Sequence, residues 1–106
     1  MNNFPIITEL DVDFVKNYLR VDYDYDDNLI NLMIVSAQSY IQAFLNQKFT
    51  DFEEVPFEFT IAALGLIAQW YEKRAITNEG TNMMLLEHSF NDILSQYRKY
   101  IDEGEA

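Results

Sequence analysis

Residues 61–71 read Ile-Ala-Ala-Leu-Gly-Leu-Ile-Ala-Gln-Trp-Tyr, and this stretch decides the fold. It is apolar on nearly every side of a helix, which is typical of a helix at the centre of a domain. Its alanines allow close approach of neighbouring elements. Gly65 costs about 1 kcal/mol relative to Ala inside a helix. We therefore expect another element to pack closely against Gly65.

Two signals bound this central helix. Pro56 suits a first helical turn, where its missing N–H matters least. Glu72-Lys73-Arg74 places cations at the negative end of the helix dipole. We therefore predict a helix over 56–74, preceded by irregular or briefly extended chain over 48–55.

A second long helix is predicted over 26–47, where apolar residues recur at three- and four-residue spacing. The apolar stripe is Leu29, Ile30, Met33, Ile34, Ala37, Tyr40, Ile41, Phe44 and Leu45. The other face carries Asn28, Asn31, Ser36, Gln38, Ser39, Gln42 and Asn46. That face is almost uncharged, which indicates a surface that meets another protein as well as water.

Two shorter helices complete the expected fold. The first runs from about Thr8, which forms a capping-box-like pair with Asp11, to Arg20. The last covers 89–101, and a short extended segment is expected near 81–86. The sequence thus predicts an all-α, four-helix domain with two long and two shorter helices. The domain spans 1–101, and the acidic tail 102–106 is expected to fray.

Composition excludes several classes of protein. The chain has 106 residues, 18 acidic and 7 basic side chains, a formal net charge of −11 and no cysteine. Disulfide scaffolds, thiol nucleophiles and cysteine zinc sites are excluded, and so is tight binding to bare nucleic acid, which needs Lys and Arg. With no secretory signal and no bilayer-length apolar run, we expect a soluble domain made inside a cell.

The acidic residues do not form a recognisable catalytic or metal motif. Asp22, Asp24 and Asp26 have the spacing that opens an EF-hand loop, but Asp27 and Met33 replace its essential Gly and Glu. Glu53, Glu54 and Glu58 gather around Pro56, where a helix start favours acidic residues. His88 has no second histidine for a metal site. We predict no catalytic, cofactor or metal site.

Two clusters mix aromatic and basic residues. They are Trp70, Tyr71, Lys73 and Arg74 in the central helix, and Tyr97 and Arg98 near the C-terminus. Trp, Tyr and Arg are enriched at interface hot spots. A core position for Trp70, with a basic helix end beside it, explains the first cluster equally well. Both clusters are candidate interfaces.

The order of several motifs resembles the tailed-phage head–tail connector (adaptor) family of small α-helical proteins. The motifs are Lys-Asn-Tyr-Leu-Arg-Val-Asp (16–22), Asp-Asp-Asn-Leu-Ile (26–30), Ala37 with Tyr40-Ile41, Ala-Gln-Trp-Tyr-Glu-Lys-Arg (68–74) and Ile-Leu-Ser-Gln-Tyr-Arg (93–98). The similarity covers about residues 8–100. It lies in the order and spacing of the motifs, and no single motif is diagnostic.

The resemblance implies a structural virion protein at the head–tail junction, made in the bacterial host cytoplasm, with no catalysis and no cofactor. It implies a ring of on the order of a dozen copies under the portal protein, closed by head-to-tail interfaces. The ring extends the DNA channel and contacts the next neck or tail protein. DNA passes without specific binding, and no membrane is involved.

An acidic channel wall would repel phosphates and keep friction low. The channel-lining candidates are Asp22, Asp24, Asp26, Asp27, Glu53, Glu54 and Glu58. The alternative is an acidic interaction module, such as a DNA mimic or a regulator of a basic partner. A small enzyme is the third hypothesis, and no motif supports a reaction class for it.

Overall fold

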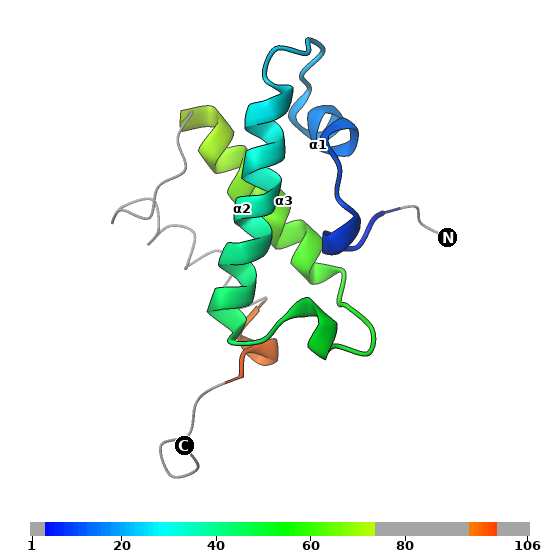
Figure 1. The fold of residues 1–106 in the computed structure, drawn as a ribbon, viewed down its shortest axis with the longest axis vertical. Helices are drawn as coiled ribbons and strands as arrows, with labels where there is room; N and C mark the ends of the chain where they lie inside the picture. Colours follow the sequence, from blue (N-terminus) through cyan, green and yellow to red (C-terminus); the bar gives the residue numbers. More distant parts are fainter. Residues whose placement is uncertain (1–3, 74–93, 100–106) are drawn as a thin grey trace.

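A computed structural model describes residues 4–73 and 94–99, and every regular element in these ranges is helical. The α-helices are α1 (Val12–Leu19), α2 (Asp27–Leu45) and α3 (Glu58–Lys73), and the 3-10 turns are η1 (Ile7–Glu9), η2 (Phe49–Asp51) and η3 (Ser95–Tyr97). Figure 1 shows α2 crossing α3, with α1 beside the N-terminal half of α2. The all-α prediction is confirmed for this part of the chain.

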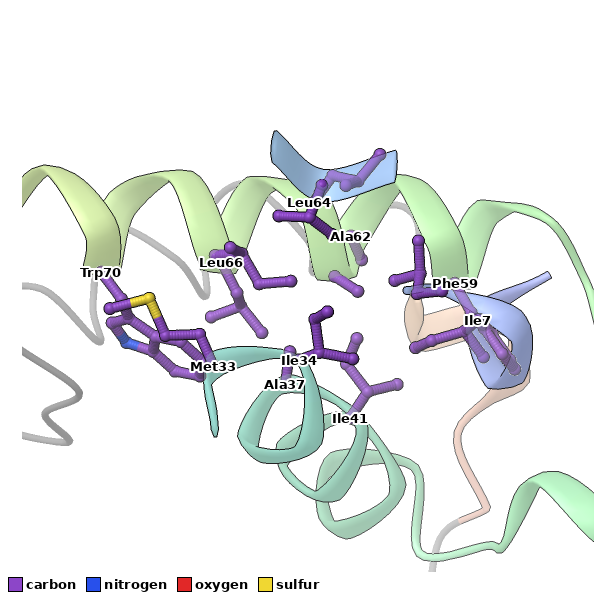
Figure 2. Packing of buried hydrophobic residues seen from close by; sticks show 14 of the residues in the cluster. Ile7, Met33, Ile34, Ala37, Ile41, Phe59, Ala62, Leu64, Leu66 and Trp70 are labelled. Atoms are coloured by element: carbon purple, nitrogen blue, oxygen red, sulfur yellow. The ribbon is translucent and has the colours of Figure 1, made fainter. Parts of the chain in front are cut away.

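The core forms where α2 and α3 pack against each other, as the apolar stretch 61–71 predicts. Figure 2 shows Met33 and Trp70 at one end of the cluster, and Ile7 and Phe59 at the other. Ala37 and Ala62 are buried between the two helices and let their backbones approach closely. The central position predicted for α3 is confirmed, because eight of its residues, from Phe59 to Trp70, are buried.

Gly65 does not have the packing role that we expected. The residue is exposed, and a Cβ atom added to it would have nothing within 4 Å among the described residues. Among the described residues, that expectation is therefore wrong. The small residues that serve the contact with α2 are the buried alanines.

Helix α1 begins later than the capping-box pattern predicts. Asp11 is the N-cap residue: it has extended backbone angles, and its carboxylate accepts a 2.9 Å hydrogen bond from the Phe14 N–H. Thr8 lies instead in η1, separated from α1 by the extended Leu10. The predicted end is confirmed, because Arg20 closes the helix in a left-handed conformation with φ 64°.

The region predicted as irregular or briefly extended over 48–55 contains the 3-10 turn η2. Lys48 and Phe52, on either side of this turn, have extended backbone angles. No β-strand occurs in residues 4–73 or 94–99, and the segment expected near 81–86 lies outside them.

The predicted fourth helix over 89–101 is described only over 94–99. Leu94 is buried in the same core as α2 and α3. The single turn η3 follows, and Arg98 has extended angles (φ −71°, ψ 135°), which end the helical backbone. The helix is therefore not continuous to Ile101, and a four-helix count is not confirmed. The predicted tail 102–106 is not among the described residues.

Candidate interaction surfaces

The acidic loop between α1 and α2 is held by one lysine. Lys16 places its ammonium 2.7 Å from an Asp24 carboxylate oxygen and 2.9 Å from an Asp27 oxygen. Hydrogen bonds to these two carboxylates raise the pKa of Lys16 well above its usual range. Lys16 therefore stays charged and partly neutralises a loop that carries four aspartates.

Not all four aspartates of this loop remain accessible. Asp22 and Asp24 are exposed, whereas Asp26 and Asp27 are half-buried at the start of α2. Asp26 accepts a 2.6 Å hydrogen bond from the Tyr71 hydroxyl. The carboxylates that the loop exposes to solvent are therefore mainly those of Asp22 and Asp24.

Tyr71 links the loop to the C-terminal half of α3. Its hydroxyl lies 2.9 Å from that of Tyr23, whose ring stacks on Tyr25 with centroids 4.4 Å apart. Burial, together with the hydrogen bonds to Asp26 and Tyr23, raises the pKa of Tyr71 well above its usual range. Tyr71 therefore acts as a neutral hydrogen-bond donor. Tyr25 is 83% exposed and presents the outer aromatic surface of the loop.

The other members of the predicted aromatic and basic cluster in the central helix do not all lie at the surface. Trp70 is only 2% exposed, which matches the core interpretation, and its indole N–H has no hydrogen-bond partner among the described residues. Lys73 is exposed at the end of α3. Arg74 falls outside the described ranges. Tyr71 and Lys73 are thus the members that reach the surface.

Tyr97 and Arg98 are both half-buried and contact the chain's own elements. Tyr97 packs edge-on against Phe59, with centroids 5.2 Å apart, and its hydroxyl lies 3.3 Å from a Glu58 carboxylate oxygen. Burial and the neighbouring Glu58 charge raise the pKa of Tyr97. The Arg98 guanidinium lies 4.5 Å from the centre of the Phe44 ring, which is a cation–π distance.

The acidic residues around Pro56 also differ in their exposure. Glu58 is half-buried and bonded to Tyr97, whereas Glu53 and Glu54 are exposed between η2 and α3. The described structure therefore leaves Asp22, Asp24, Glu53 and Glu54 as the exposed carboxylates among the channel-lining candidates.

Amide side chains on α2 bind the chain's own backbone. Gln38 donates to the Ile7 carbonyl (2.8 Å), and Gln42 accepts from the Phe49 N–H (2.8 Å). At the end of the helix, Asn46 donates to the Lys99 carbonyl and Gln47 to that of Tyr97. Part of the polar face predicted to meet another protein thus fixes the N-terminal, η2 and η3 segments instead.

The outward face of α2 is uncharged and partly apolar. No charged residue occurs from Asn28 to Gln47. Leu32 and Val35 are 53% and 51% exposed, and Asn28, Asn31 and Ser39 beside them are also exposed. The apolar stripe read from the sequence did not include Leu32 or Val35, although their spacing from the buried residues could have placed them outside.

An apolar groove of about 320 Å³ lies between α1, the N-terminal segment and the first half of α3. Its lining residues are Phe4, Phe14, Tyr18, Phe57, Thr60, Ile61 and Leu64. Ile61 is 57% exposed, and Phe4 packs edge-on against Phe14 and Phe57. This surface was not predicted from the sequence, because residues from three separate segments of the chain form it.

The described residues contain no candidate metal site. No group of three or more His, Asp or Glu side chains within 4–73 and 94–99 could hold a metal ion. None of the helices described is long and apolar enough to cross a membrane. His88 lies outside these ranges. The geometry offers surfaces for binding proteins.

Comparisons with known proteins place the chain in a family. No curated protein and no solved structure matches it significantly. The profile of the phage gp6-like head-tail connector proteins matches residues 9–98, which is most of the chain and includes α1, α2, α3 and η3. This family is a structural one, whose members are components of the phage particle and associate with other head or tail proteins. The chain belongs to the phage gp6-like head–tail connector family.

Proposed function

We propose that this protein is a neck adaptor that forms a ring under the portal vertex and extends the DNA channel. The observation that carries the proposal is the family match over residues 9–98. The proposed partners are further copies of the chain, the portal protein and the next neck or tail protein. The chain would be made in the bacterial host cytoplasm and act in the assembled particle.

The distribution of charge supports a channel role. DNA must pass such a ring without being held, and carboxylates facing the lumen repel phosphates. Asp22, Asp24, Glu53 and Glu54 are exposed and are the residues that we assign to the lumen. Asp26, Asp27 and Glu58 are bonded within the subunit and serve its fold.

Other surfaces are available for partners, one of them beside the acidic loop. Tyr25, Tyr71 and Lys73 lie around one end of α3, and the groove and the α2 outer face lie elsewhere. We assign the Tyr71–Lys73 end, together with Arg74, to contacts with the portal or tail side. The acidic interaction module is the weaker alternative, because the family match names a connector.

The genetic test removes the gene from its phage and supplies it again from a plasmid. The expected result is that heads and tails accumulate unjoined, and that the plasmid copy restores infectious particles. A plasmid copy with a stop codon at Asp27 is the control, since it makes the messenger but no folded chain. Infectious particles that form normally without the chain would contradict the proposal.

A further inference from the structure

Two uncharged surfaces lie on opposite sides of the α2–α3 pair. In a helix with 3.6 residues per turn, Leu32 and Val35 lie roughly half a turn from the buried stripe of α2. By the same geometry, Ile61 points away from the residues of α3 that face α2. Because the two helices pack through their buried faces, their outer faces point in opposite directions.

We propose that the apolar groove receives the α2 outer face of a second copy of this chain, with Leu32 and Val35 entering it. This inference rests on the proposed ring, in which each copy has two neighbours. It assigns which two faces meet between them. The contact joins two different surfaces, so each copy offers one face to each neighbour.

Electrostatics select these two surfaces. Each copy carries a formal net charge of −11, so two copies repel each other wherever carboxylates face one another. The α2 outer face belongs to a stretch of 20 residues, 28–47, without a charged side chain. None of the described residues that line the groove is charged. Two copies can therefore approach most closely when these surfaces meet.

The groove is also large enough to receive side chains. Its volume of about 320 Å³ is many times the roughly 10–15 Å³ that one water molecule needs on the same measure. Leu32 and Val35 are three residues apart and lie side by side on the helix, so both can enter one groove. Gly65, one turn after Ile61, is exposed and lacks a side chain, which leaves space for an approaching helix.

Opposite placement of the two faces explains how a ring can form. A contact between different faces of identical subunits repeats from copy to copy, and it closes into a ring when the rotation per copy is suitable. A contact of groove with groove would stop at a dimer. The position of the two faces therefore fits a head-to-tail ring.

Cross-linking tests this pairing without background, because the chain has no cysteine. Variants carry Val35→Cys, Ile61→Cys or both, and a short bismaleimide is added to each protein. All are studied at high concentration in high salt, which screens the repulsion, and again on purified portal rings from the same phage. Both positions are more than half exposed, so folding is not disturbed.

The expected result is a ladder of products beyond the dimer from the double variant. A mixture of the two single variants gives one dimer, and each single variant alone stays monomeric. The control pairs Val35→Cys with Thr50→Cys, an exposed position in η2, and gives no ladder. A dimer from either single variant alone, or no ladder both in solution and on portal rings, would overturn the pairing.

Charge insertion provides a second readout. Leu32→Glu on the α2 outer face and Phe4→Glu in the groove should each abolish the ladder when introduced into the Val35→Cys/Ile61→Cys double variant. Thr50→Glu adds the same charge elsewhere and should leave it. If Phe4→Glu abolishes portal binding while the ladder persists, the groove holds the portal protein and the pairing is wrong.

These outcomes separate the inference from the proposed function. A chain that binds portal rings without linking positions 35 and 61 keeps its proposed function and contradicts the pairing. A ladder without any portal binding supports the pairing and contradicts the proposed function.

Discussion

The hydroxyl of Tyr71 on α3 donates a 2.6 Å hydrogen bond to the carboxylate of Asp26 at the start of α2. This bond joins two residues that are 45 apart in sequence, at the point where the acidic loop ends and α2 begins. Asp26 is therefore a structural residue as much as a surface charge. The bond also couples stability to pH.

Stability should fall at alkaline pH. The pKa of Tyr71 in the folded chain lies above its ordinary value near 10, so the folded state holds the phenol proton more tightly than the unfolded state. This stabilisation is complete below about pH 10 and is lost as pH rises through the folded pKa. Tyr97 and Lys16 act in the same direction, because their pKa values are also raised.

The variant Tyr71→Phe tests this coupling. It should be less stable than the wild type at pH 7 and should lose less stability between pH 9 and pH 11. Unfolding followed by the fluorescence of Trp70, the only tryptophan, gives the measurement. Tyr25→Phe removes an exposed phenol and is the matched control. If the stability of Tyr71→Phe fell between pH 9 and pH 11 as steeply as that of the wild type, this coupling would be contradicted.

Lys16→Met should loosen the acidic loop. It removes the cation that bridges Asp24 and Asp27 and leaves four aspartates without a counter-ion from α1. We expect a lower melting temperature, with the deficit shrinking as salt is added, because salt screens the repulsion that remains. Lys48→Met changes the net charge equally at an exposed site and should have little effect. Equal effects of the two substitutions would show that Lys16 acts only through net charge.

Asp11→Ala should destabilise the fold by about 1 kcal/mol, the usual cost of losing an N-cap side chain. The structure assigns the cap to Asp11, whose carboxylate binds the Phe14 N–H. Thr8→Ala, at an exposed position in η1, should change stability by less than about 0.5 kcal/mol. Urea unfolding of the two variants measures both effects. A larger loss of stability from Thr8→Ala than from Asp11→Ala would show that Thr8, and not Asp11, caps the helix.

Gly65→Ala should stabilise the isolated subunit by about 1 kcal/mol, since Gly is unfavourable inside a helix and nothing crowds the new methyl group. Thermal unfolding of the monomer measures this gain. A loss of stability would show that a neighbouring group within the subunit needs the space.

The long elements could be predicted because periodicity reports burial directly. The predicted helices 26–47 and 56–74 differ from α2 and α3 by only one or two residues at each end. The predicted start of α1 was wrong because Thr8 and Asp11 both belong to residue types that cap helices. Local sequence does not say which of two adequate caps is used.

The surfaces were harder to predict, because they depend on contacts between distant residues. The sequence around Trp70 is compatible with a buried or an exposed side chain. Packing in the α2–α3 core determines that Trp70 is buried. The groove requires Phe14 and Ile61 to face one another, and no pattern within either helix encodes that. The sequence does not show that Asp26 and Glu58 are bonded carboxylates, because their partners Tyr71 and Tyr97 are distant in sequence.

Electron microscopy of purified portal rings, incubated with an excess of the chain, tests the proposed assembly of a ring on the portal with exposed carboxylates around the DNA channel. We expect an added ring, coaxial with the portal, whose lumen is lined by the loops that bear Asp22 and Glu53. Portal rings that stay bare at saturating concentrations of the chain would contradict it.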